Sequence, residues 1–198
     1  MAKSEISIES IKKLKELSGA GLTDAKKALV EAKGDFDKAL EAMRKKGLTK
    51  AEKRGDRETR EGLIEAYIHD GRLGAIVEVN CETSFVAKTD EFKTLAHQIA
   101  MQIASMNPLY VSEEDIPEDV KKAKVKELEE NFKGPANMKD KILEGHMKKA
   151  FSDKVLMNQP YILDDTKTVE QFIKEAIAKT GENITIRQFK RIELGVTE

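Results

Sequence analysis

The sequence predicts an α+β protein in which short N-terminal helices precede a small antiparallel sheet and further helices. Apolar residues recur at helical spacing three times within the first 47 residues, and an Asp-Gly pair near residue 70 joins two alternating runs. A helical pattern followed by an extended run closes the chain. A chain of 198 residues holds one large domain, or a medium domain with a small satellite.

Composition excludes several classes of protein. The single cysteine, Cys81, cannot form an internal disulfide, and no Cys or His cluster has metal-site spacing, which indicates a reducing compartment. No apolar run approaches the roughly 20 residues that span a bilayer, and the first five residues lack a signal-peptide core. The formal net charge of −1 gives no global attraction for nucleic acid. We therefore expect a cytoplasmic protein without metal or cofactor.

The first 47 residues are predicted to form three short helices. The first begins after Ser7 and stops before Gly19, the second stops at Gly34, and the third is capped by Asp35 and closed by Gly47. A bundle this small has a marginal core, so we expect a recognition module that meets a partner through an exposed turn. The apolar positions are Ile8, Ile11, Leu14 and Leu17; Leu22, Ala25, Ala28, Leu29 and Ala32; and Phe36, Ala39, Leu40 and Met43.

Residues 44–60 carry eight cations and three acids, a net charge of +5. This segment is either an electrostatic footprint for RNA or an acidic protein face, or a solvated helical connector. No aromatic residues interleave the charges to stack bases, which favours the connector.

A β-hairpin is predicted from Leu63 to Asn80, with Asp70-Gly71 as a two-residue turn. Placing His69 opposite Arg72 brings six apolar residues to one face, which we expect to be the core side. These residues are Ile64, Ala66, Ile68, Leu73, Ala75 and Val77.

Helical patterns dominate the rest of the chain. One helix is predicted to begin at Thr89 and end at Asn107-Pro108, a peripheral one opens at Pro117, and another follows Gly134-Pro135 and continues through residues 154–157. A last helix stops at Gly181, before a strand over residues 184–194. That strand has interrupted parity, which predicts a bulge or a sheet edge and, through the edge, a homodimer.

The search for catalytic chemistry is negative. The sequence holds no phosphate-binding loop and no zinc-binding His pair. His69, His97 and His146 fall on different elements, and His146 is expected at the edge of a core. Cys81 shares strand parity with Val79, as a small buried hydrophobe does. These observations indicate a protein that is not an enzyme.

One stretch, residues 78–88, places a large apolar side chain where a strand is expected to run out into a loop. Phe85 lies there directly after three polar residues, 82–84. Binding residues concentrate on loops of a rigid scaffold, so Phe85 is a candidate anchor for another protein. Phe85 is equally compatible with a side chain that fills the local core.

Two stretches resemble signatures of the elongation factor Ts family: residues 14–29, which read LKELSGAGLTDAKKAL, and residues 78–88, which read EVNCETSFVAK. Their order and spacing match, and the likeness extends over nearly the whole chain. The resemblance implies a ubiquitin-associated-like (UBA-like) three-helix domain with a basic linker at residues 1–55. It also implies an α+β dimerisation-type core at residues 56–198, as in the short forms of the family.

The resemblance implies guanine-nucleotide exchange on elongation factor Tu, in its GDP-bound and nucleotide-free states, during translation elongation. The family's wedge motif corresponds to Thr83, Ser84, Phe85 and Val86, and its phenylalanine inserts into the GTPase and disturbs the magnesium and phosphate site. Ser84 replaces the usual Asp, so a carboxylate is missing. The N-terminal contact positions of the family correspond to Lys15, Leu22 and Thr23.

A function of another class stays open beside exchange. It is a non-enzymatic RNA-binding or UBA-type adaptor that uses the basic linker and the three-helix module. The absence of interleaved aromatics speaks against direct nucleic-acid binding. Phe85 discriminates the two, because only the exchange factor needs it.

Overall fold

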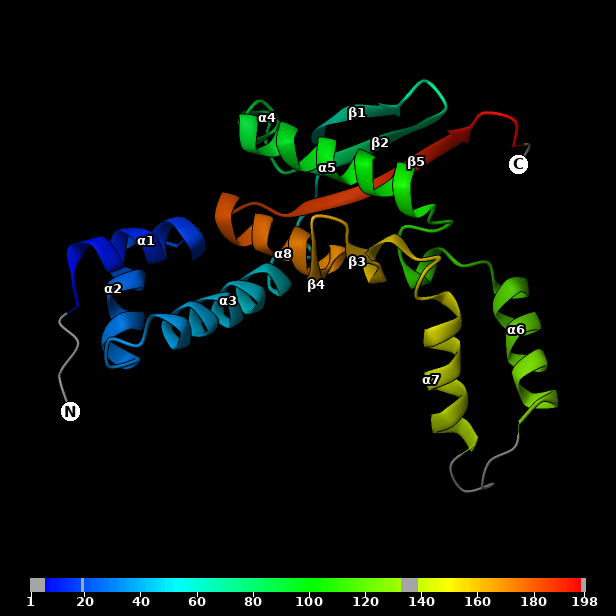
Figure 1. The fold of residues 1–198 in the computed structure, drawn as a ribbon, viewed down its shortest axis with the longest axis horizontal. Coiled ribbons are helices and arrows are strands. Elements are labelled where there is room, and N and C mark those ends of the chain that lie inside the picture. Colours follow the sequence, from blue (N-terminus) through cyan, green and yellow to red (C-terminus); the bar gives the residue numbers. More distant parts are fainter. Residues whose placement is uncertain (1–5, 19, 133–138, 197–198) are drawn as a thin grey trace. The chain divides into compact units, whose positions relative to one another are not determined.

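A computed structural model describes residues 6–18, 20–132 and 139–196 (Figure 1). Of residues 48, 50, 52, 140 and 141 it describes the backbone alone. Within these residues, helices accompany a three-stranded sheet of order β1-β2-β5 and a two-stranded sheet of β3 and β4, which confirms the α+β class.

The chain divides into two compact units that are discontinuous in sequence. The first contains the described residues up to Ile64, together with Glu78–Ala96 and Gln171–Ile186. The second contains Glu65–Val77, His97–Glu170 and the described residues from Arg187 onward. All candidate site residues belong to the first unit.

Three N-terminal helices enclose their own apolar cluster, as predicted. They are α1 (Ile8–Ser18), α2 (Leu22–Glu31) and α3 (Phe36–Glu52). The side chain of Asp35 accepts a hydrogen bond from the Lys38 backbone nitrogen at 3.1 Å and caps α3. The buried residues of the cluster are Ile11, Leu14, Ala25, Ala28, Leu29, Ala39 and Met43.

The predicted end of the third helix at Gly47 is wrong. Helix α3 continues through this glycine to Glu52. A Cβ placed on Gly47 would lie 3.2 Å from the Cβ of Ala178 in α8 (Val169–Thr180), so close packing of two helices accounts for the glycine. Helix α2 does stop before Gly34: it ends at Glu31, and Lys33 and Gly34 follow with φ values of 54° and 84°.

Strands β1 (Glu61–His69) and β2 (Leu73–Cys81) form the predicted hairpin, but the prediction of one shared apolar face is wrong. Ala75 and Val77 are buried, whereas Ile64 and Ile68 are 67% and 72% exposed. Ala66 is also exposed.

The length of the connection explains the error in the hairpin. Three residues, 70–72, separate the strands instead of two, and the additional residue shifts the register by one, which turns every β1 side chain to the opposite face. The partly buried side chains of β1 are therefore Leu63, Glu65 and Tyr67. Of these, Glu65 and Tyr67 contact His97 of α5 (Asp90–Met106), with a 3.1 Å bond from Glu65 and an edge-on ring contact from Tyr67.

Helix α5 follows its prediction closely. It ends before Asn107-Pro108, and its predicted apolar stripe is buried. Strand β5 (Ile184–Glu193) lies at one edge of the three-stranded sheet, as predicted, and follows the helix stop at Gly181, where φ is 81°. The buried stripe of α5 is Phe92, Leu95, Ala96, Ile99 and Ile103.

Helices α6 (Glu118–Glu130) and α7 (Lys139–Phe151) lie side by side in the second unit (Figure 1). The predicted break at Gly134-Pro135 falls outside the described residues. The predicted continuation of α7 through residues 154–157 is wrong. Val155 instead forms a parallel β-bridge with Tyr110. The Tyr110 backbone nitrogen donates to the Lys154 carbonyl, and the Tyr110 carbonyl accepts from the Leu156 backbone nitrogen.

A small sheet and a buried amide pair were not predicted. Strands β3 (Pro160–Tyr161) and β4 (Asp164–Thr168) form the antiparallel sheet. The amide nitrogen of Gln102 donates to the side-chain oxygen of Gln159 at 3.1 Å, and both side chains are buried with all their polar atoms bonded.

Candidate partner-binding site

The candidate site is the Phe85 turn, residues 83–86. Its last three residues lie in a single-turn helix, α4 (Ser84–Ala87), and not in the loop that was expected. The Phe85 side chain is 84% exposed, the largest exposed fraction of any large apolar side chain in the described part of the chain. The interpretation of Phe85 as a plug for the local core is therefore wrong.

The strand that leads to the turn is buried at its end. Val79 and Cys81 are fully buried, and the Cys81 sulfur donates to the Thr83 carbonyl at 3.2 Å. Burial, with the nearby Glu182 carboxylate, raises the pKa of the Cys81 thiol to about 11. A neutral buried thiol matches the predicted role of a small hydrophobe.

Close backbone packing fixes β1 against this strand end. Gly62 has a φ of 152°, and a Cβ added there would lie 2.2 Å from the Val79 carbonyl oxygen and 2.8 Å from the Asn80 Cα. Only glycine fits such a position without displacing the backbone.

The start of the turn is held by a carboxylate from a distant part of the chain. Glu182, in the α8–β5 connection, accepts hydrogen bonds from the Thr83 backbone nitrogen at 3.0 Å and from the Thr83 hydroxyl at 2.6 Å. In the opposite sense, Glu82 accepts from the Asn183 backbone nitrogen at 2.6 Å. Arg57 lies 3.4 Å from the Glu82 carboxylate.

The end of the turn is held locally. The Thr89 hydroxyl donates to the Val86 carbonyl at 2.8 Å and accepts from the Phe92 backbone nitrogen at 3.2 Å, which caps α5. Ala87 is buried. Both ends of the turn are thus anchored while the Phe85 side chain projects into solvent.

The four predicted wedge residues are contiguous and differ in their surroundings. Thr83, Ser84 and Val86 are partly buried, and Phe85 alone is exposed. The Ser84 hydroxyl makes no hydrogen bond to any described residue. Thr83 is therefore the residue whose side chain connects the turn to a distant part of the unit.

The predicted N-terminal contact residues lie on two consecutive helices. Lys15 is in the last turn of α1, and Leu22 and Thr23 begin α2. All three are exposed, and the Leu22 side chain is 54% exposed. We call these three residues the N-terminal contact surface.

The basic linker shows paired cations. Lys46 lies 3.4 Å from Asp24, Arg57 pairs with Glu82, and Arg60 lies 2.7 Å from Glu58. Pairing of this kind fits a solvated connector, since it leaves fewer cations to attract a polyanion.

The histidines form no catalytic group. His97 lies off the apolar stripe of its helix and binds Glu65, and His69 contacts the Tyr67 hydroxyl at 3.0 Å. His146 is exposed, so its predicted place at a core edge is wrong. Among the side chains that the structure describes, no group of three or more His, Cys, Asp and Glu could hold a metal ion.

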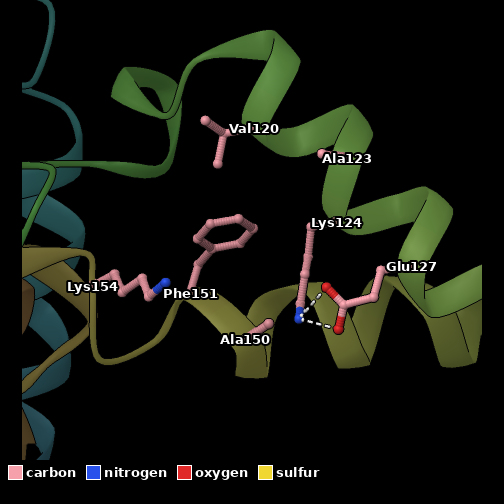
Figure 2. Close-up of a pocket in the computed structure, with 7 residues that line it drawn as sticks. All are labelled: Val120, Ala123, Lys124, Glu127, Ala150, Phe151 and Lys154. Carbon is pink, nitrogen blue, oxygen red and sulfur yellow. Dashed lines mark hydrogen bonds and ion pairs between the residues drawn. The ribbon is translucent and has the colours of Figure 1, made fainter.

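A cavity of about 350 Å³ lies between α6 and α7, and Figure 2 shows its lining. The Phe151 ring points toward Val120, while Lys124 reaches Glu127 at 2.8 Å. The apolar residues that line this cavity belong to the contact between the two helices, and Lys124 is already paired with Glu127. The cavity is therefore a groove between packed helices. In the described ranges no helix is both long and apolar enough to cross a membrane.

Sequence reasoning missed the residues that hold the turn. Glu182 and Asn183 lie about 100 positions from Thr83 and Glu82. Periodicity carries no signal for such a contact. Only the helix stop at Gly181 indicated that a connection with polar residues begins there.

The chain is similar to known proteins over nearly its whole length. A protein-family model described as elongation factor TS matches residues 4–196. Elongation factor Ts of Thermotoga sp. (strain RQ2) is 52% identical over 193 residues, which cover 96% of this chain and 97% of the relative. The protein of the same name from Coprothermobacter proteolyticus is 50% identical over 195 residues, covering 96% and 99%.

Proposed function

This chain belongs to the elongation factor Ts family, and on that premise we propose that it promotes GDP release from elongation factor Tu during translation elongation. The observation that carries the proposal is the 84% exposed Phe85 on a turn anchored at both ends. An exposed phenylalanine on a rigid mount is suited to insertion into a partner.

The proposed mechanism is displacement by a wedge. Phe85 enters between helices of the GTPase and disturbs its magnesium and phosphate site, with Thr83, Ser84 and Val86 supporting the contact. Burying a phenylalanine contributes about 1.5–3 kcal/mol, enough to offset part of the nucleotide's binding when several contacts act together. The absence of a carboxylate at Ser84 makes Phe85 the main contributor.

Exchange of this kind needs no bond chemistry, so the proposed activity is not that of an enzyme. A factor that weakens GDP binding is itself bound more weakly when GDP is present, because coupling between two sites is reciprocal. The ternary complex is therefore transient and releases GDP. Binding of GTP then expels the factor.

We also propose that residues 1–55 form a UBA-like docking domain and residues 56–198 the core. The apolar cluster confined to the three N-terminal helices supports this division. The exposed N-terminal contact surface would bind the partner as a second contact, in addition to that of the Phe85 turn. We expect a cytoplasmic protein that does not bind nucleic acid directly, since several cations of its basic linker are ion-paired and no aromatic residues lie between them.

A homodimer is proposed through the edge of the three-stranded sheet. Strand β5 is an edge strand, and Ile192 and Leu194 at its end are exposed apolar residues. Light scattering at micromolar concentration should give twice the chain mass of 22.2 kDa. A monomeric mass would contradict the dimer and leave exchange unaffected.

The test of the wedge is release of labelled GDP from elongation factor Tu. Phe85→Ala should slow stimulated release at least roughly tenfold, equivalent to about 1.4 kcal/mol, because the inserting side chain is gone. Thermal unfolding should not change, since the side chain packs against little of its own protein.

Leu163→Ala is the matched control for Phe85→Ala. Leu163 is also an exposed apolar residue in a tight turn, between β3 and β4. The Leu163→Ala variant should stimulate GDP release at the same rate as the unaltered chain. An unchanged rate of stimulated GDP release for Phe85→Ala would contradict the wedge mechanism.

A further inference from the structure

The start of the Phe85 turn has little support within α4 itself. Helix α4 has only four residues, and a helix of one turn is unstable in isolation. Phe85 packs against little, so its side chain does not fix the backbone either. Thr83, at the N-cap of α4, makes no side-chain capping bond to its own helix.

The hydroxyl of Thr83 is instead bound by Glu182. One carboxylate accepts from both donors of one residue, the backbone nitrogen and the hydroxyl, at 3.0 and 2.6 Å. Hydrogen bonds to a charged acceptor are shorter and stronger than neutral ones, and two donors from a single residue fix its orientation.

A second carboxylate bond runs in the reverse direction. Glu82, directly before the turn, accepts from the backbone nitrogen of Asn183, directly after Glu182. The Asn183 side chain is buried and donates to the carbonyls of Gly55 and Arg57, at 3.1 and 2.7 Å. The α8–β5 connection is thereby fixed before it binds the turn. We call Glu82, Thr83, Glu182 and Asn183 the carboxylate clamp.

We propose that Glu182 is a positioning residue for exchange: through Thr83 its carboxylate holds the Phe85 turn in the inserting conformation before the partner arrives. The inference rests on the proposed function of Phe85. Without the clamp, the start of the turn is held less firmly, and the ordering that must then occur on binding opposes insertion.

Glu182→Gln tests the clamp with little change in shape. The amide keeps one acceptor oxygen, loses the other and has no charge. Stimulated GDP release should slow about fivefold to tenfold. In a Phe85→Ala chain the same substitution should change release less than twofold, because the position of the turn no longer matters.

A merely structural role of Glu182 predicts another pattern. Loss of folded protein would slow release by the same factor in both backgrounds, and this result would overturn the proposal. Glu91→Gln is the matched control, since Glu91 binds Lys179 of α8 at 3.3 Å without touching the turn. It should leave release unchanged.

Amide hydrogen exchange in the free protein gives a second measurement. The Thr83 amide should be protected in the unaltered chain and exchange at least tenfold faster in Glu182→Gln, with the α5 amides unaffected. Thr83→Val, which replaces the hydroxyl by a methyl group, should also slow GDP release. It provides the test if Glu182→Gln fails to fold.

The outcomes separate the two proposals. If Phe85→Ala slows release but neither Glu182→Gln nor Thr83→Val does, the clamp is wrong and the wedge stands. If Phe85→Ala has no effect, the wedge is wrong and the positioning role is wrong with it.

Discussion

The Phe85 turn and the N-terminal contact surface both expose apolar side chains, yet they are held in different ways. The turn has one exposed residue, and its backbone is bound by Glu182 from about 100 positions along the chain. The N-terminal contact surface lies on helices α1 and α2, whose cluster is formed by residues close in sequence.

The difference indicates two roles in one partner complex. A single side chain on an anchored turn is suited to enter another protein, which changes the rate of nucleotide release. An exposed surface on a small helical module is suited to docking, which changes affinity. The two regions should therefore respond differently to substitution.

The largest expected effect comes from the backbone beneath the turn. Gly62→Ala places a Cβ 2.2 Å from a carbonyl oxygen at a φ of 152°, so the free energy of unfolding should fall by about 3 kcal/mol. Urea unfolding followed by circular dichroism measures this loss. GDP release should be impaired in parallel.

Gly21→Ala is the matched substitution in the N-terminal module. Gly21 has a φ of −66°, and a Cβ there meets nothing within 4 Å. Gly21 is the N-cap of α2, where alanine is poorer than glycine, but alanine also restricts the unfolded chain, so stability should change by less than about 0.5 kcal/mol. Equal losses of stability for the two glycine substitutions would contradict this difference, because the backbone beneath the turn would then be no more constrained than that of the N-terminal module.

A smaller effect is expected at the N-terminal contact surface. Leu22→Ala should raise the concentration of factor needed for half-maximal GDP release about fivefold, near 1 kcal/mol, without changing the maximal rate. Phe85→Ala should instead lower the maximal rate. Titration of the factor against a fixed amount of elongation factor Tu measures both quantities.

Val30→Ala serves as the control for Leu22→Ala. Val30 is a similarly exposed apolar residue of α2 and was not predicted to contact the partner. It should leave both quantities unchanged. A fall in maximal rate for Leu22→Ala would mean that the module also acts on the release step.

Local rules predicted much of the fold. Helix stops at Gly34 and Gly181 and the buried stripe of α5 follow from spacing and backbone preferences that act over a few residues. The error at Gly47 has a tertiary cause. Glycine is common at helix ends, which predicted a stop at Gly47. The glycine is instead needed for close packing against Ala178, on a helix about 130 residues further along the chain.

The hairpin shows how a local rule fails by one residue. Asp70 and Gly71 do adopt positive φ, as the turn signature predicts. Arg72 joins the connection as well, and periodicity alone does not show which β1 face is covered. The contacts of Glu65 and Tyr67 with His97 decide it.

The class of the fold, the three N-terminal helices and the place of Phe85 after a strand could all be predicted from the sequence, because helix periodicity, caps and strand alternation are encoded by neighbouring residues. The exposure of Phe85 and the anchoring of its turn could not. Those properties depend on Glu182 and Asn183, which reach the turn only when the folded chain brings the α8–β5 connection beside it.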